Sequence, residues 1–451
     1  MNGIFFFIVI VAFGITAWRE WRWVAVEPEQ LSPMTLLGSN MIETAASAVT
    51  LALGLVGVMA LFLGLMKIAE EGGLLTVIAK TIRPLMTRLF PEVPANHPAM
   101  GAMVLNFSAN ALGLGNAATP FGIRAMQELD RLNPHKGTAT NAMVMFVVIN
   151  TASITILPTT VVALRAAAGS AQAAAIVPTT LFATLIATAI AIVSARLLQR
   201  FWPTPQPEAG DGTTVAALAQ ADSGFPDAAP QATADVLQTA PIEQAAAYPV
   251  WVSWLVLIGI VALIPLTAIY GRMISPWVVP GLMAAIVVFG FAKRVHVYEA
   301  FVEGAKDGFR VAIRIIPYLV AILVAIGMLR ASGALDAFID LVAPYTGLIG
   351  LPAEALPMAI MRSLSGSGAY GIMADIINDP AIGPDSYVGL LVSTIQGSSE
   401  TTFYVLAVYC GAVGVRRMRH AVAAGLIADV AAVLAAVLIC SWLFAEGLDP
   451  L

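Results

Sequence analysis

Nine apolar runs divide this 451-residue chain, and most of them approach the length that a membrane imposes. A helix needs about 20 predominantly apolar residues to cross the hydrocarbon layer. Two further apolar stretches, roughly 98–123 and 352–377, are interrupted by glycine, serine and asparagine. The pattern predicts an all-α integral membrane protein. The nine runs lie near 3–18, 43–66, 139–164, 173–195, 251–270, 277–292, 311–329, 387–409 and 421–444, the first and the sixth being short.

The composition supports a membrane environment and argues against several soluble classes. Charged residues make up 11% of the chain and apolar residues 59%, with a mean hydropathy of +0.85, whereas about a quarter of the residues in soluble domains are charged. A net charge of −5 without a basic stripe argues against nucleic acid as a partner. Cys410 and Cys440 lie in apolar runs, and the four histidines lack metal-ligand spacing. We therefore expect no disulfide, no metal and no cofactor.

The sequence divides into two membrane domains, 1–200 (half one) and 250–451 (half two), joined by a linker at 201–249. The linker is rich in alanine, proline, glutamine and aspartate, contains no lysine or arginine, and lacks apolar periodicity, which is typical of flexible segments. The first apolar run could also be interpreted as a signal peptide. Because no lysine or arginine precedes it and no clear cleavage site follows, we expect a retained first helix.

The two halves repeat one another in order and spacing over more than 100 residues. Chance similarity between apolar helices would explain one match but not a series, so we interpret the halves as related units. The matched segments are 64–67 with 327–330, 97–100 with 356–358, 112–116 with 364–368 and 149–155 with 395–401.

Lysine and arginine placement predicts that the halves are inserted in opposite orientations, because cytosolic loops carry the excess of these residues. In half two, the basic loop 416–419 precedes the last run, and the stretch before 387–409 carries only acidic charges. In half one, basic residues flank the interrupted stretch instead, and the loop 165–172 contains a single arginine. Half two begins with two apolar runs, 251–270 and 277–292, where half one begins with one, 3–18. The additional crossing would invert the orientation of the helices that follow. We therefore expect a multi-pass protein of the bacterial inner membrane, with the amino terminus and the linker cytosolic and the carboxyl terminus outside.

The interrupted stretches are predicted to be re-entrant hairpins, because the charges that flank each of them lie on one side of the membrane. Non-helical backbone at membrane depth is tolerated only where it is buried in protein or lines a wet cavity. The alternative is that their small residues let helices pack closely. The polar residues at the first tip are Asn106, Ser108, Asn110, Asn116 and Thr119, and those at the second are Ser363, Ser365, Ser367 and Tyr370.

The runs that follow the hairpins carry polar clusters at mid-depth, at 150–155 and 396–402. Such hydroxyl-rich clusters favour local unwinding, and paired broken helices in inverted halves indicate a midplane site. Glu400 costs about 3 kcal/mol at that depth unless it faces a partner or a cavity. It is either a site residue or a protonated carboxyl bonded to a neighbouring helix, and Arg362 would pair with Glu400 or with an anionic substrate. The predicted site for substrate or ion comprises Asn106, Asn110, Asn116, Asn150, Ser153, Thr155, Ser365, Ser367, Gln396, Ser399, Glu400 and Thr401.

No nucleophile–base pair, HExxH, GxGxxG or phosphate loop is present in the sequence. An intramembrane enzyme would have to rest its chemistry on Glu400 alone. We therefore expect that the protein is not an enzyme.

Several long strings make the chain similar to a known family. Residues 1–200 resemble the spore maturation protein A family at Gly64–Glu71, Leu89–Pro94 and Gly113–Pro120. Residues 250–445 resemble the spore maturation protein B family. The strings that carry this second resemblance are Ile316–Ala321, Ser363–Ala369 and Gln396–Tyr404.

The resemblance implies a fusion of two gate-domain proteins, from a group named after concentrative nucleoside transporters and the membrane part of ferrous-iron transporters, and linked to dehydration of the spore core. It also implies that Gln396, Ser399 and Glu400 contact a ligand or coupling ion. Half one departs from that pattern, since Ile154 stands where Glu400 stands.

These features together predict a permease-like protein that moves a small polar or ionic solute, such as a nucleoside-like ligand, with a coupling cation. The alternative is a non-transporting membrane scaffold or regulator of envelope or spore maturation. Membrane lipid is an expected partner in either case. The sequence leaves an oligomer possible and names neither the solute nor the coupling ion.

Overall fold

The computed structural model describes residues 2–24, 30–113, 115–203 and 248–444, so most of the predicted linker lies outside the described residues. The described part is all helical and contains no strand. Half one contains α1 (Asn2–Trp21), α2 (Pro33–Glu71), α3 (Leu74–Leu89), α4 (Pro98–Ala111), α5 (Gly115–Arg131), α6 (Asn141–Ala152), α7 (Thr159–Ala167) and α8 (Ile176–Leu198). Half two contains α10 (Val250–Ala292), α11 (Val297–Ala331), α12 (Ala334–Thr346), α13 (Leu356–Leu364), α14 (Gly366–Asn378), α15 (Tyr387–Ser398), α16 (Thr402–Gly411) and α17 (Ala421–Phe444). Short 3-10 helices lie at Ala173–Ala175, Gly347–Ile349 and Ala353–Ala355.

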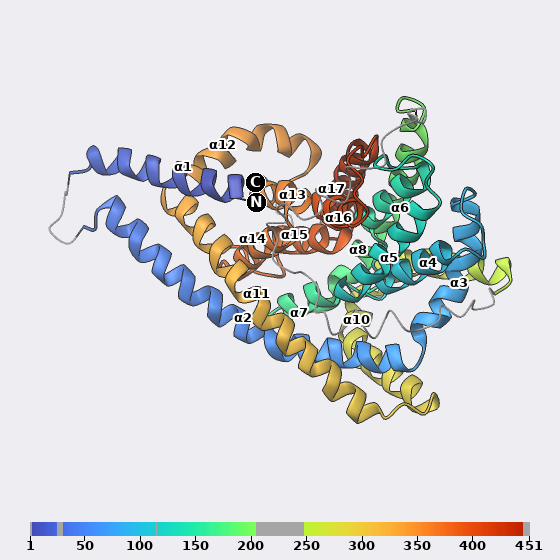
Figure 1. The fold of residues 1–451 in the computed structure, drawn as a ribbon. Helices are drawn as coiled ribbons and strands as arrows, with labels where there is room; N and C mark the ends of the chain where they lie inside the picture. Colours follow the sequence, from blue (N-terminus) through green and yellow to red (C-terminus); the bar gives the residue numbers. More distant parts are fainter. Residues whose placement is uncertain (1, 25–29, 114, 204–247, 445–451) are drawn as a thin grey trace.

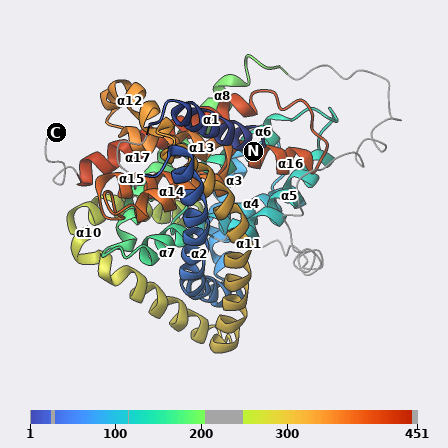
Figure 2. The same cartoon turned by 90° about the vertical axis from the view of Figure 1, so that its left-hand side faces the viewer.

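The long helices α2 and α11 lie side by side along one edge of the molecule (Figures 1 and 2) and run antiparallel, because Gly64 meets Phe301 while Gly327 meets Thr44. Small residues four positions apart let the backbones approach closely. A Cβ added at Gly308 would lie 2.6 Å from the Cα of Ala60. The glycines of α11 therefore fix how near the two halves come at this edge.

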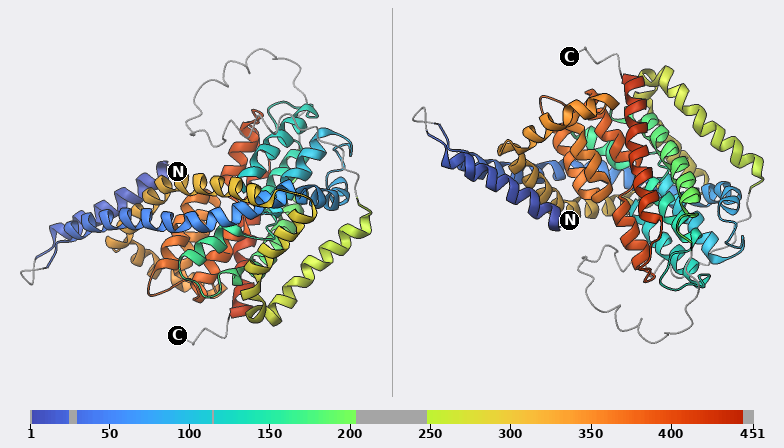
Figure 3. Two further views of the ribbon diagram at one scale, coloured as in Figure 1. Left: turned by 90° about the horizontal axis from the view of Figure 1, so that it is seen from below. Right: turned by 90° about the horizontal axis from the view of Figure 1, so that it is seen from above.

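The helices α8 and α17 form the other close pair, seen as adjacent green and red helices in Figure 3. Among the described residues, these two helices are long and apolar enough to cross a membrane. Their facing sides consist largely of alanine and threonine, including Ala183, Ala187, Ala428 and Ala432, all of which are buried. Small side chains of this kind are what membrane helices use at close contacts.

Residues 250–292 form one continuous helix, α10, where the sequence predicts two separate runs. Glycine and proline inside an apolar segment do not by themselves end a helix, because neighbouring helices and local adjustments satisfy the freed backbone groups. The predicted runs 251–270 and 277–292 are therefore joined by helical residues and not by a loop.

Two other predicted runs are each divided in two by non-helical residues. The run 139–164 becomes α6 and α7, separated by residues 153–158, and the run 387–409 becomes α15 and α16, separated by residues 399–401. In half one, Ser153 adopts a φ of 24° and Pro158 precedes α7. Neither a positive φ nor a proline continues an α-helix. The polar clusters of the sequence therefore coincide with real breaks in the helices.

Candidate functional site

The two helix breaks touch each other through the backbone. The amide of Glu400, in the break of half two, donates a hydrogen bond of 2.7 Å to the carbonyl of Thr151, in the last turn of α6. The last carbonyls of a helix have no partner within it. The break of half two therefore supplies a donor to the helix end that the break of half one leaves open.

In half one, the end of α4 closes against the break between α6 and α7. The backbone amide of Ile156 donates to the carbonyl of Ala111 at 3.0 Å. The side-chain nitrogen of Asn110 donates to the side-chain oxygen of Asn150 at 2.9 Å. Gly113 has a φ of 72°, and a Cβ there would collide with the carbonyl oxygen of Leu157. This contact is thus made entirely by neutral groups.

In half two, the corresponding contact between α13 and the break is charged. Arg362, which is only 5% exposed, donates from Nη1 to the hydroxyl of Thr401 at 3.3 Å. Its Nη2 lies 3.8 Å from Oε2 of Glu400, an ion pair too long to be a hydrogen bond. The Glu400 side chain is 45% exposed. Of the two pairings left open by the sequence, the structure contains the one between Arg362 and Glu400.

Asp429 in α17 is a polar residue of this region that the sequence analysis missed. It is 5% exposed, and its Oδ2 accepts a hydrogen bond of 2.7 Å from the hydroxyl of Thr402, the first residue of α16. Its Oδ1 is buried without a hydrogen-bond partner among the described residues. The sequence does indicate this residue, because Asp429 is an acidic residue inside the apolar run 421–444, just as Glu400 is inside the run 387–409.

Four of the remaining predicted residues lie in the break of half one or at the start of α14. Ser153 and Thr155 lie in the break of half one, where the Thr155 hydroxyl donates to the Ser153 carbonyl. Ser365 caps α14 by accepting from the amide of Gly368, and its hydroxyl lies 3.4 Å from that of Ser367.

The other four predicted residues lie in different places. Gln396 lies on α15, with a buried Oε1 that has no partner in the described part of the chain, and buried Ser399 begins the break. Asn106 instead contacts the carbonyl of Ala118 and the hydroxyl of Tyr409, so it braces α4 against α5 and α16. The side chain of Asn116 lies outside the described residues.

The far ends of the broken helices are joined crosswise between the halves. Arg165, fully buried at the end of α7, forms an ion pair of 2.8 Å with Asp385, just before α15, and donates to the carbonyl of Pro384 and the hydroxyl of Ser393. We call this contact the Arg165 clamp. A buried arginine requires such a set of acceptors, since its desolvation is otherwise uncompensated.

At the opposite end, the loop after α16 contacts the loop before α6. The amide of Ala139 donates to the carbonyl of Arg417 at 3.0 Å, and Arg419 donates to Asn141 at 2.9 Å. Burial, together with the charge of Arg419, lowers the pKa of His420 to about 4. His420 is therefore neutral at pH 7, and the arginines supply the positive charge of this loop.

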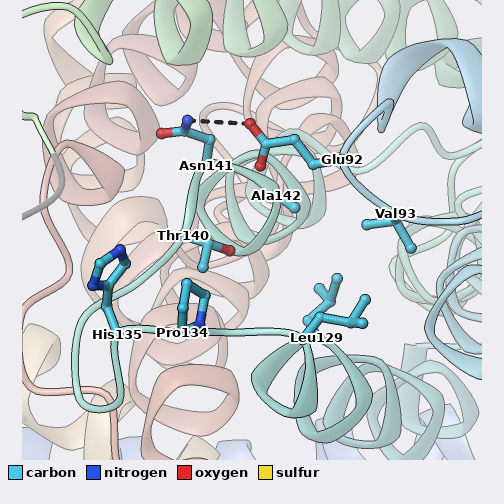
Figure 4. A pocket seen from close by; sticks show the side chains of 9 residues that line it. Glu92, Val93, Leu129, Pro134, His135, Thr140, Asn141 and Ala142 are labelled. Carbon is cyan, nitrogen blue, oxygen red and sulfur yellow. Dashed lines mark hydrogen bonds between the residues drawn. The ribbon is translucent and has the colours of Figure 1, made fainter. Parts of the chain in front are cut away.

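A pocket of about 240 Å³ lies near the start of α6, away from both breaks. Figure 4 shows Glu92 accepting a hydrogen bond of 3.3 Å from Asn141, with His135 on the opposite side. None of the predicted site residues lines this pocket. Within the described ranges, no group of three histidine, cysteine or acidic residues is placed to hold a metal ion.

Comparison with known proteins places these features in a family context. The family model described as nucleoside recognition (Gate) matches residues 52–168 and 312–416, which contain both interrupted stretches and both breaks. Spore maturation protein B of Bacillus subtilis (strain 168) is 48% identical over 169 residues, covering 38% of this chain and 94% of that protein. Spore maturation protein A of the same organism is 45% identical over 156 residues, covering 35% of this chain and 80% of that protein. The two relatives match different halves of the chain.

A more distant relative and a solved structure were also found. The inner membrane protein YjiG of Escherichia coli (strain K12) is 32% identical over 107 residues, covering 23% of this chain and 70% of that protein. The crystal structure of the Alcanivorax borkumensis YdaH transporter aligns over 99% of both chains, with 16% identity and a TM-score of 0.35.

Proposed function

Because the chain belongs to the nucleoside recognition (Gate) family and joins a spore maturation protein A-like half to a spore maturation protein B-like half, we propose that it is an inner-membrane permease for a small polar solute. The proposed domains are 1–200, a linker at 201–249, and 250–451. The proposed substrate site lies where the two breaks meet. The observation that carries the proposal is the hydrogen bond from Glu400 to Thr151, since it brings the polar interruptions of two membrane helices to one place.

The contacts at the helix ends support an inverted relation between the halves. The start of α6 lies beside the end of α16, and the end of α7 lies beside the start of α15, so the two broken helices run antiparallel. The helices α8 and α17 are also antiparallel, because Arg419, just before α17, bonds to Trp202, just after α8. Antiparallel packing of equivalent helices is what a two-fold axis in the membrane plane requires. On this proposal α4–α5 and α13–α14 are the re-entrant hairpins.

The charged contacts support the proposed orientation, with the amino terminus and linker cytosolic and the carboxyl terminus outside. Arg330, at the end of α11, forms ion pairs with Asp375 and Asp379, so these acidic residues lie at one end of the molecule with the Arg165 clamp. Arg416 and Arg417 lie at the other end. Arg19, which the orientation places outside, donates to the carbonyl of Ser332 at 2.8 Å. It therefore caps the end of α11, a role independent of topology signals.

The proposal is tested by ligand binding to the purified full chain. Thermal unfolding is measured with a panel of nucleosides and other small polar solutes, and each hit is followed by uptake into proteoliposomes. A ligand at 100 times its Kd should stabilise the wild type by about 2.7 kcal/mol. Glu400→Gln should remove most of that gain, because it replaces a partly exposed carboxylate at the proposed site.

A matched control is Glu303→Gln, which neutralises an exposed carboxylate paired with Lys306 far from the breaks. This variant should respond to ligand as the wild type does. Identical behaviour of wild type and Glu400→Gln with every solute would contradict the permease. If replacing Gln396, Ser399 and Glu400 together also left cellular function intact, the protein would act as a membrane scaffold or regulator.

A further inference from the structure

Three charged residues come close together where α13, the break of half two and α17 meet. Arg362 is the one cation of this group, and Glu400 and Asp429 are its two carboxyl groups. Arg362 and Asp429 are each 5% exposed, whereas the Glu400 side chain is 45% exposed. The group therefore has one more carboxyl than it has positive charges, and its least solvated carboxyl is Asp429.

The partners of Asp429 do not compensate an ionised carboxylate. Its Oδ2 accepts from the hydroxyl of Thr402, and the hydroxyl of Ser363 lies close to this carboxyl. Its Oδ1 is buried without a partner, and in the described part of the chain no ion pair of Asp429 is present. A buried charge without a pairing cation or full hydrogen bonding is strongly disfavoured relative to the neutral acid.

Arg362 is already engaged elsewhere. It donates to Thr401 and faces Glu400 at 3.8 Å, and its Nε is itself buried without a partner among the described residues. Two carboxyl groups near one cation disfavour each other's ionised form. Water stabilises an ionised Asp429 poorly, because this residue is only 5% exposed.

The neighbouring helices supply no second cation to Asp429. The helices packed on α17 besides α13 are α6, α8, α15 and α16. Of these, α6 has no titratable residue and α8 has Arg196 alone, in its last turn. Tyr387 begins α15, and α16 contains Tyr404, Tyr409 and Cys410. The charge state of Asp429 is therefore set by Arg362 and Glu400.

We propose that Asp429 is a proton-binding site, and that this proton is the coupling cation of the permease. The coupling role rests on the proposed function. When the proton leaves Asp429 for water, the new carboxylate attracts Arg362, which loosens the long contact between Arg362 and Glu400. Glu400 and the hydroxyl of Thr401 are then free to exchange the arginine for substrate, while Thr402 stays bonded to Asp429. No bond other than O–H breaks, and the proton is the only species released.

The first test is infrared spectroscopy of the full chain in lipid at pH 7. The wild type should show the carbonyl band of a protonated carboxylic acid, and Asp429→Asn should lose it. Asp385→Asn, which removes a half-exposed carboxylate of the Arg165 clamp, should keep it. A band of equal intensity in wild type and Asp429→Asn, or no band in the wild type, would overturn the assignment.

A second measurement uses the wild type, so it does not depend on the folding of a variant. Dicyclohexylcarbodiimide modifies protonated carboxyl groups within membranes, and peptide mapping locates the modified residue. We expect modification at Asp429 that falls as the pH is raised and that is the same in sodium and choline buffers. Loss of modification in sodium alone would show that the site takes a metal cation and would overturn the proposal. Modification of Asp429 without uptake of any solute would retain the proton site and remove the permease.

Discussion

The two halves close the same contact with different chemistry. In half one, the end of α4 meets the break through Asn110 and Asn150, whereas in half two α13 meets the break through Arg362 and Thr401. The following helices differ in the same sense. Thr184 and Asp429 are each the ninth residue of α8 and α17, but Thr184 bonds within its own helix and Asp429 depends on Thr402 of another. The contact at the break of half one is thus neutral, whereas the contact at the break of half two is charged.

The largest expected effect concerns the buried charge that half one does contain, in the Arg165 clamp. Arg165→Met would leave the carbonyl of Pro384 without its side-chain donor and the carboxylate of Asp385 without its cation, although Ser170 and Ala171 still donate to that carboxylate. Removing one partner of a buried pair costs about 3–5 kcal/mol. Because Asp385 is 41% exposed, we expect about 3 kcal/mol, measured by chemical denaturation in detergent.

Arg310→Met is the matched control, because Arg310 and its partner Asp307 are both exposed. It should change stability by less than about 1 kcal/mol. Equal losses in the two variants would show that the clamp does not hold the halves together.

An intermediate effect should follow from placing a carboxylate at the break of half one. Ile154→Glu puts glutamate at the position that matches Glu400, but Asn110 stands where half two has Arg362. A carboxylate at membrane depth without a cation costs about 3 kcal/mol on insertion scales. Since Ile154 is only half-buried, we expect about 2 kcal/mol, measured by thermal unfolding.

Ile154→Met, which keeps the position apolar, is the control and should cost less than about 1.5 kcal/mol. If Ile154→Glu were tolerated as well as Ile154→Met, the difference in charge between the halves would not reflect a difference in what each can stabilise.

The smallest effect is expected for the amide contact itself. Asn110→Leu leaves the side-chain oxygen of Asn150 without its donor, which costs about 1 kcal/mol for a neutral group. Thr401→Val is the equivalent change in half two, and it should cost about 2 kcal/mol because the lost partner is the charged Arg362. Both costs are measured by thermal unfolding. A larger loss of stability for Asn110→Leu than for Thr401→Val would contradict our expectation that the charged contact of half two contributes more than the neutral contact of half one.

Much of the fold follows from apolar run length. The runs 173–195 and 421–444 correspond to α8 and α17 with small shifts, because a helix that is apolar on all sides has few alternative structures. The breaks were also foreseeable, since hydroxyl clusters at 150–155 and 396–402 compete for backbone groups. The continuity of α10 was not, because glycine and proline end a helix in water more readily than in a membrane.

The positions of the helix breaks were predictable, but the side-chain pairings around them were not. Asn110, Asn150, Glu400 and Thr401 are all found at the breaks, yet nothing in the spacing indicates that Asn110 bonds Asn150 while Arg362 bonds Thr401. Such pairs depend on the rotation of each helix about its axis, which packing determines. Asp429 was overlooked because its helix shows no other polar interruption, although its depth alone carried the same signal as that of Glu400.

The crosswise contacts at the helix ends have a consequence for how the protein assembles. Arg165 of half one donates to Pro384 and Asp385 of half two as well as to acceptors of its own half, and the carbonyl of Arg417 accepts from the amide of Ala139. An isolated half would lack these partners from the other half. Joining both halves in one polypeptide converts their encounter into an intramolecular step at high effective concentration and fixes their ratio at one to one. Synthesis of the chain therefore delivers matched halves without any need to balance the expression of two genes.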